Sequence, residues 1–168
     1  MLAKLIAPAL LALLAPNADA RFTIITPQPM GSDPQRQREA PCGGFEMTDR
    51  SHGVTEWPVG GIDVAWDSAN ATAGWQVSAV LANDTSCTLT SKTNLRTLYT
   101  HATGPFCLPS VGGLPEWVGL DAVLQIQQWT GDGDYFFSCS AIKFVDGPAP
   151  PSTCNMYHGK RMRVLDED

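Results

Sequence analysis

The strongest constraint on the fold is a pair of apolar runs joined by a short turn. The run Val123–Trp129 leads into Gly131-Asp132-Gly133-Asp134, and a second run, Tyr135–Val145, follows the turn. Two runs of this kind around a Gly/Asp turn predict a β-hairpin. Further strands are expected over Phe22–Thr26, a β-branched stretch that stops at Pro27, and over the alternating stretch Trp75–Leu81.

The rest of the chain also favours short strands over helices. It contains 15 glycines and 13 prolines, and it has no helix-period pattern of useful length. Short strands separated by turn residues are typical of a β-sandwich. We therefore predict a single all-β sandwich, with two long loops, Gln28–Trp57 and Leu89–Trp117, at its ends.

The first 20 residues have the features of an export signal. Lys4 supplies a positive start, Leu5–Ala15 is apolar, and Ala18-Asp19-Ala20 gives a small-x-small cleavage site. The apolar run is shorter than the roughly 20 residues that cross a membrane, so we expect a cleaved signal and no membrane span. Arg21 then becomes the N-terminus. The predicted organisation is a signal peptide (1–20), a β-sandwich domain (21–147), and a Pro-rich lead with a charged tail that carries Cys154 (148–168).

Charge narrows the classes of partner. The formal net charge is −6. Nucleic acids and anionic membranes require basic surfaces, so neither is an expected partner.

The cysteines fit an exported protein. Five follow the signal, and in an oxidising compartment they predict two disulfides with one cysteine left over; the spacing alone does not fix the pairing. Cysteine and histidine pairs with zinc-ligand spacing are absent from the sequence. Two sequons, at Asn70 and Asn83, predict glycosylation of exposed positions.

Several motifs in order resemble a known family. They are Phe22…Pro27, Pro41-Cys42-Gly43-Gly44-Phe45, Trp57-Pro58-x-Gly60-Gly61, Gly104-x-Phe106-Cys107-Leu108-Pro109, Gly131-Asp132-Gly133, and Tyr135-x-x-x-Cys139 with the later Cys154. This set is similar to the fungal copper-acquisition-factor family, whose fold resembles that of lytic polysaccharide monooxygenases. The resemblance implies an immunoglobulin-like sandwich and a fungal protein that is secreted or resides in the cell wall. It also places Cys42, Cys107, Cys139 and Cys154 on family positions and leaves Cys87 unpaired.

The resemblance also implies which residues stand where the family binds Cu(II). Family members use the amino group and imidazole of a leading histidine, a second histidine, and an aspartate. Here Arg21 leads the processed chain, Asn70 is the equivalent of the second histidine, and Ala141 falls at the aspartate position; Asp132 or Asp134 is the alternative for that last place. A guanidinium stays protonated and offers no lone pair to a metal. We therefore expect no copper cofactor; the alternative is copper binding through a rearranged N-terminal site.

Other site candidates have simpler explanations. His52, His101 and His158 lie in polar segments and are expected to be solvated rather than to bind a metal. The carboxylate pairs Asp49/Glu56 and Asp132/Asp134 could suggest glycoside hydrolysis, but turn-forming aspartates explain the second pair. Most tryptophans are expected in the core, with Trp57 or Trp117 as a minority candidate for a sugar platform.

Together these observations predict a secreted, non-enzymatic binding or interaction protein that has lost the copper ligands. Oxidative polysaccharide cleavage is not expected without a copper centre. The expected partner is an extracellular ligand, either a cell-wall polysaccharide or a protein. Arg21 is expected to form an ion pair with a nearby carboxylate.

Overall fold

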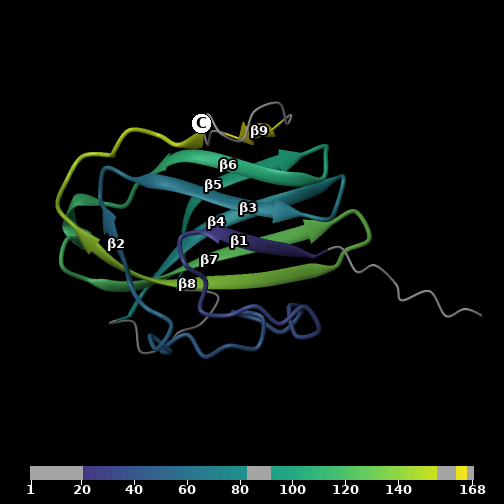
Figure 1. Cartoon of the computed structure of the whole chain (residues 1–168), viewed down its shortest axis with the longest axis horizontal. Helices are drawn as coiled ribbons and strands as arrows, with labels where there is room; N and C mark the ends of the chain where they lie inside the picture. The colour runs from purple at the N-terminus through teal and green to yellow at the C-terminus, as the bar shows by residue number, and fades with distance from the viewer. Residues whose placement is uncertain (1–20, 83–91, 155–161, 166–168) are drawn as a thin grey trace, which may run out of the picture.

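Two β-sheets face each other in the computed structural model, which describes residues 21–82, 92–154 and 162–165 (Figure 1). A three-stranded sheet has the order β1-β3-β6, and a six-stranded sheet has the order β2-β8-β7-β4-β5-β9. The strands are β1 (Phe22–Thr26), β2 (Thr55–Pro58), β3 (Ile62–Ser68), β4 (Ala73–Leu81), β5 (Thr93–Thr100), β6 (Gly104–Val111), β7 (Asp121–Thr130), β8 (Tyr135–Val145) and β9 (Met162–Leu165), with one short 3-10 helix, η1 (Pro115–Trp117). The predicted all-β sandwich is confirmed.

The predicted hairpin is confirmed as the pair β7 and β8. These strands are antiparallel along their whole length, from Asp121 opposite Lys143 to Trp129 opposite Tyr135. The turn closes through a hydrogen bond from the Thr130 N–H to the Asp134 carbonyl (3.0 Å), and Gly133 adopts a positive φ of 84°. A glycine takes that conformation without the steric cost that a side chain would add.

The core lies between the two sheets. Alternate side chains point inward from each strand, as the two-residue period of a strand requires. Aromatic rings fill its centre. The ring centroids of Trp66 in β3 and Trp75 in β4 are 5.1 Å apart, and Trp75 also packs edge-on against Phe22 of β1, with 5.1 Å between the ring centroids. Burial of these large apolar side chains is the main force that holds the sheets together.

The prediction of a long loop over Leu89–Trp117 is wrong. The described part of this stretch contains β5, β6 and η1. Both strands give weak signals for a physical reason: β5 lies toward one side of its sheet and has few buried side chains, while β6 is an edge strand that carries Pro105 and Pro109. Proline is tolerated at a sheet edge but lowers the apparent strand propensity.

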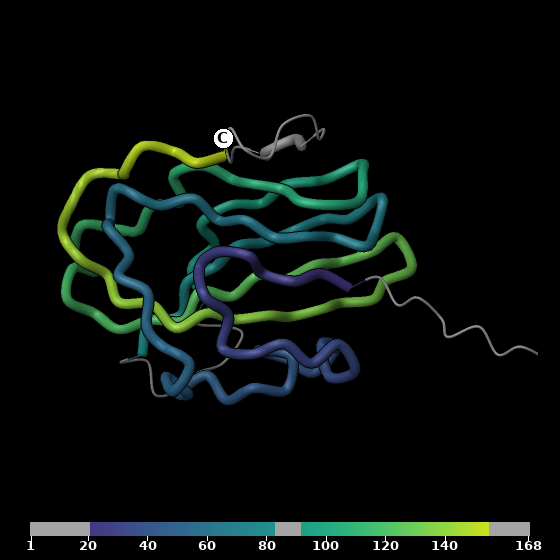
Figure 2. The backbone as a smooth tube through the Cα atoms, in the orientation of Figure 1, coloured from purple at the N-terminus to yellow at the C-terminus, as the bar shows by residue number. Residues whose placement is uncertain are grey.

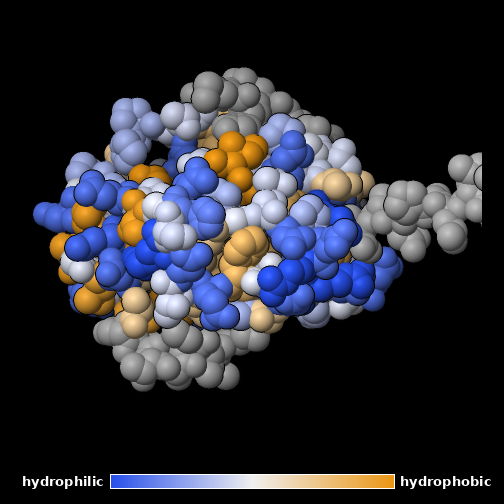
Figure 3. All heavy atoms as spheres, turned by 60° about the horizontal axis from the view of Figure 1, so that its bottom comes forward, coloured by the Kyte–Doolittle hydropathy of each residue, from blue (hydrophilic) through white to orange (hydrophobic). Residues whose placement is uncertain are grey.

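The other predicted loop, Gln28–Trp57, is mostly correct. Its last residues form β2, which runs parallel to β8, and the rest folds over the outer face of the six-stranded sheet (Figure 2). Met30 and Cys42 of this covering loop pack on Val123, Cys139 and Ala141 of β7 and β8, and a disulfide joins Cys42 to Cys139. Seen from this side, hydrophobic residues appear as separate patches among hydrophilic ones (Figure 3).

The second disulfide ties the C-terminal segment to the three-stranded sheet. It joins Cys107 of β6 to Cys154, so the four cysteines expected to pair do so. Cys87 lies outside the described residues. Further along, β9 pairs with β5 in antiparallel fashion, from Thr97 opposite Leu165 to Thr100 opposite Met162. Among the described residues, no helix has the length and apolar character of a membrane span.

Candidate functional site

One end of the sandwich collects most of the residues singled out from the sequence. Arg21 stands at the start of β1, and its carbonyl accepts a hydrogen bond from the Ala69 N–H (2.9 Å) in the turn between β3 and β4. Asn70 follows directly in that turn, and the β7–β8 turn with Asp132 and Asp134 lies at the same end of the molecule (Figures 1 and 2). Arg21 and Asn70 are therefore neighbours in the structure.

Asn70 is committed to its own turn. Its side-chain Oδ1 accepts a hydrogen bond from the Thr72 N–H (3.0 Å), and its backbone N–H donates to Ser68 Oγ (3.2 Å). This is the local pattern by which asparagine stabilises a tight turn. An amide oxygen held in this way is a poor substitute for an imidazole nitrogen as a ligand for Cu(II).

The two turn aspartates differ in their surroundings. Asp134 forms an ion pair with Arg38 of the covering loop, with 2.7 Å between its Oδ2 and Arg38 Nη2. Asp132 is exposed at the tip of the turn. A metal bound by Asp134 would have to compete with Arg38, so Asp132 is the more accessible carboxylate of the pair.

Ala141 does not join this group. It lies in the middle of β8 opposite Val123 and is buried under the covering loop beside Met30 and Cys42. A strand advances about 3.3 Å per residue, so Ala141 is about 20 Å along β8 from Tyr135, where the strand begins. The structure thus separates the third predicted ligand position from Arg21 and Asn70.

The histidines remain apart from one another. His101 is exposed in the turn between β5 and β6, at the same end as Arg21, whereas His52 is exposed in a turn of the covering loop. His158 lies outside the described residues. His101 is the histidine whose position bears on an N-terminal metal site.

Two buried amides, which sequence analysis did not identify, bond to residues of β1 and β3. Gln37 of the covering loop donates through Nε2 to the Phe22 carbonyl, and Gln128 of β7 donates through Nε2 to Ser68 Oγ (3.3 Å). The Oε1 atoms of Gln37 and Gln128 are buried and have no hydrogen-bond partner among the described residues. Unsatisfied buried acceptors are costly, so each of these two oxygens is an unusual feature of the interior. A hydrophobic-periodicity pattern offers no signal for either glutamine.

An open hollow of about 460 Å³ lies on the outer side of the same end, lined by Arg21, Phe22, Thr23, Ile25, Asp67 and Ala69. Asp67 is exposed and pairs in register with Thr23 of β1. The hollow therefore contains one cationic and one anionic side chain, which is the setting expected for an Arg21 ion pair.

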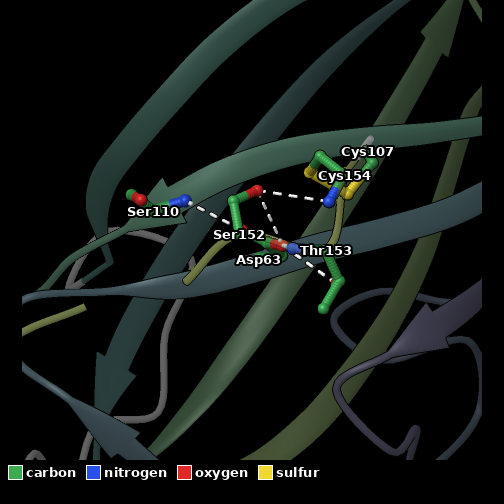
Figure 4. Close-up of a disulfide and its surroundings, with 6 residues drawn as sticks. All are labelled: Asp63, Cys107, Ser110, Ser152, Thr153 and Cys154. Atoms are coloured by element: carbon green, nitrogen blue, oxygen red, sulfur yellow. Dashed lines mark hydrogen bonds between the residues drawn. A yellow bond between two sulfur atoms is a disulfide. The ribbon is translucent and has the colours of Figure 1, made fainter. Parts of the chain in front are cut away.

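A second cluster has the residue types of a metal site but is already bonded. Ligand atoms of Asp63, Cys107 and Cys154 lie within 4.8 Å of one another, the one such group of His, Cys, Asp and Glu among the described residues. The two sulfurs form a disulfide, which removes both thiolates as ligands (Figure 4). The cluster therefore links β6 to the C-terminal segment and is not a metal centre.

Asp63 holds the C-terminal segment beside that disulfide. Its Oδ2 accepts hydrogen bonds from Thr153 N–H, Thr153 Oγ1 (3.0 Å) and Ser152 Oγ (3.0 Å), and its Oδ1 accepts one from Ser110 N–H (3.3 Å). Partial burial acts to raise the pKa of this carboxyl, but the hydrogen bonds from Thr153, Ser152 and Ser110 outweigh it and hold the pKa below its usual value. We name this group the Asp63 clamp: Asp63, Ser110, Ser152, Thr153 and the Cys107–Cys154 disulfide.

The tryptophans proposed as a sugar platform are buried. Trp57 is 0 % exposed and donates through Nε1 to the Val111 carbonyl (3.0 Å), while Trp117 is 6 % exposed and packs on Phe144. The hypothesis of a sugar platform on these two tryptophans was wrong because both side chains pack into the core. Trp57 lies in β2, and Trp117 lies in η1 and packs on β8.

Comparison with known proteins agrees with the geometry. A family model described as "Copper acquisition factor BIM1-like" matches residues 19–159. No curated protein matches the sequence at a significant level. The groups described around Arg21, namely a guanidinium, a committed amide and a carboxylate paired with arginine, do not fit the nitrogen-rich ligand set that Cu(II) prefers. The chain belongs to the BIM1-like copper acquisition factor family.

Proposed function

We propose that this protein is a secreted, non-enzymatic binding protein, located at the fungal cell surface or outside the cell, which uses the family fold without a copper cofactor. The observation that carries this proposal is the pairing of Arg21 with the Ala69-Asn70 turn. If Arg21 begins the processed chain, the two positions that face a metal in the family hold a permanent cation and a hydrogen-bonded amide.

The electrostatics of that end support the same conclusion. A guanidinium beside the α-amino group repels a divalent cation, and Asp134, one of the two turn carboxylates at this end, is paired with Arg38, which leaves Asp132 as the accessible one. Without a copper centre the protein has no means of activating oxygen at this end. We therefore assign it a binding role and not oxidative cleavage of polysaccharide.

Copper titration of the processed chain tests the proposal. The protein is produced with Arg21 as its natural first residue, and Cu(II) uptake is measured by isothermal titration calorimetry in a weakly coordinating buffer. We expect no tight stoichiometric binding. Stoichiometric uptake with nanomolar affinity overturns the proposal.

A second candidate function is copper handling through a rearranged site. The position of the β7–β8 turn favours it, because Asp132 and Asp134 lie at the same end as Arg21 and His101 is exposed nearby. In this alternative the Arg21 amino group and these side chains together bind the metal. Asp132→Asn, Asp134→Asn and His101→Ala variants separate the two: a copper affinity that falls in any of them supports the rearranged site.

A further inference from the structure

We propose that the outer face of the six-stranded sheet, at the end nearest Arg21, is a binding platform for a neutral β-linked polysaccharide. The residues concerned are Tyr99, Trp129 and Tyr135, which we name the aromatic row. This inference rests on the proposed binding function and identifies the surface and the class of ligand for it.

The strand register aligns the aromatic row across four neighbouring strands. Trp129 of β7 lies opposite Tyr135 of β8 on one side and opposite Gly74 of β4 on the other, and Gly74 lies opposite Tyr99 of β5. Residues opposite one another in a sheet share a face. Because neighbouring strands are about 4.8 Å apart, the row extends over about 14 Å, enough for a few linked sugar rings.

Gly74 allows the central ring to lie flat. A Cβ atom at this position would be 2.0 Å from Trp129 Cε2 and 2.3 Å from both Cζ2 and Nε1. The indole therefore lies across the bare backbone of β4, with one ring face against the sheet and the other directed away from it. Tyr99 meets it edge-on, with ring centroids 5.7 Å apart and planes at 86°. That contact fixes the orientation of the indole.

The row is also accessible, unlike the other tryptophans. Tyr135 is 50 % exposed, and Tyr99 and Trp129 are partly exposed. Trp57, Trp66, Trp75 and Trp117 are all buried. The covering loop that buries the far half of this face, over Val123, Cys139 and Ala141, does not bury the aromatic row.

Polar groups border the row in the manner that a sugar requires. Gln76 and Gln127 form the next register pair on the same face, and both are half-buried. Lys92 donates to Gln127 Oε1 (2.8 Å), which fixes that amide and leaves its N–H groups as the donors it can offer. A pyranose ring presents apolar C–H groups on its faces and hydroxyls at its rim, so it can stack on the indole while its hydroxyls bond to the amides.

Charge selects a neutral polymer. The chain carries a formal net charge of −6, and Asp132 is exposed near Tyr135 at the end of the row, whereas Asp134 is paired with Arg38 and Lys92 is bonded to Gln127. Anionic glycans would be repelled. The shared chemistry that fits is that of β-linked glucose or N-acetylglucosamine polymers, and the choice between them is left to the arms of the experiment.

Tryptophan fluorescence gives a direct test, because Trp129 is the one partly exposed tryptophan of the five. The full processed chain is titrated separately with oligosaccharides of chitin, β-1,3-glucan and cellulose, and quenching by iodide is measured with and without each sugar. We expect one of the three to protect Trp129 from iodide, and the corresponding insoluble polysaccharide to deplete the protein from solution.

Variants establish that the aromatic row is responsible. Trp129→Ala is expected to weaken binding by about tenfold or more, and Tyr135→Ala by about threefold to tenfold. Tyr135 is half exposed, so its variant remains folded even if Trp129→Ala does not. Leu114→Ala is the matched control: Leu114 is 43 % exposed, precedes η1 away from the row, and its removal should leave binding unchanged.

The outcomes distinguish this inference from the proposed function. Sugar binding that is lost in Tyr135→Ala and kept in Leu114→Ala supports the platform. Sugar binding that is equal in all variants overturns the platform but leaves a binding function elsewhere on the protein. Binding to none of the three polysaccharides also overturns the platform, and the copper titration then decides the proposed function independently.

Discussion

The Asp63 clamp and the Arg21 end differ in how their polar groups are already used. At the clamp, a carboxylate and two sulfurs come within 4.8 Å, yet every one of them is bonded to another part of the chain. At the Arg21 end, the groups are a guanidinium, an amide that bonds within its own turn and a carboxylate paired with Arg38, and in our proposal they do not bind copper. The comparison teaches that residue types alone do not define a metal site, since bonds within the chain can occupy groups that would otherwise be good ligands.

The largest effect is expected from breaking the disulfide of the clamp. Changing Cys107→Ser together with Cys154→Ser opens a link between residues 47 apart in sequence. Loop-closure entropy predicts a loss of about 4 kcal/mol in the free energy of unfolding. Denaturant unfolding monitored by circular dichroism measures it. A loss below about 1 kcal/mol would show that the clamp contributes little to the fold.

Restoring imidazoles should convert the Arg21 end into a copper site. A processed chain with Arg21→His and Asn70→His supplies an amino group and two imidazoles on residues that the structure places side by side. We expect Cu(II) affinity at least about a hundredfold higher than in the unchanged chain, which equals about 2.7 kcal/mol. The matched control is Arg21→Lys with Asn70→Gln. Equal affinity in both double variants would contradict our account of the site.

Removing the Asp63 carboxylate should have an intermediate effect. Asp63→Ala leaves the N–H groups of Ser110 and Thr153 without their acceptor, and both are near solvent. Because water can replace part of the lost bonding, we expect a decrease of about 1 to 2 kcal/mol in the free energy of unfolding. Asp67→Ala, at an exposed position on the same strand, is the control and should be nearly neutral.

The pH dependence of stability should reveal the same carboxylate. The pKa of Asp63 is lower in the folded state than its ordinary value near 3.9, so its ionised form stabilises the fold above that pH. The stability difference between the unchanged chain and Asp63→Asn is expected to be constant above about pH 5 and to shrink as the pH falls through the folded pKa. A difference that grows on acidification would reverse the assigned sign.

The smallest effect is expected at the exposed ion pair near Arg21. Arg38 and Asp134 are both about half exposed, at 52 % and 44 %. Such pairs contribute little because solvent screens the charges, so Asp134→Asn should change the free energy of unfolding by less than about 0.5 kcal/mol. Thermal unfolding at low and high salt measures this change. A larger loss of stability that depends on salt would contradict the prediction, because it would show that this ion pair contributes to the fold.

The sequence predicts a strand well where the residues that define it are adjacent in the chain. The β7–β8 hairpin was predictable because its turn residues and apolar runs are adjacent, and β1 because Pro27 ends a β-branched run. Motif order correctly placed the cysteines of both disulfides. In contrast, β5 and β6 were missed, since an exposed strand and a proline-bearing edge strand lack clear alternation.

The candidate site was predictable only in part, because it depends on contacts between residues that are distant in the sequence. The family resemblance pointed to Arg21, Asn70 and Ala141; the structure places the first two side by side, whereas β8 carries Ala141 far from them. Gln37, Gln128, Asp63 and the aromatic row could not be found from the sequence. Their significance depends on register and on contacts between residues distant in the chain, such as Trp129 over Gly74.

The edge strand β6 has one more consequence, which concerns association between copies of the chain. An open sheet edge is a template on which identical chains can stack, and two residues of β6, Pro105 and Pro109, have no N–H to donate to an incoming strand. Replacing both prolines would restore two backbone N–H donors to β6. The open edge of the strand would then be a better template for pairing between copies of the chain.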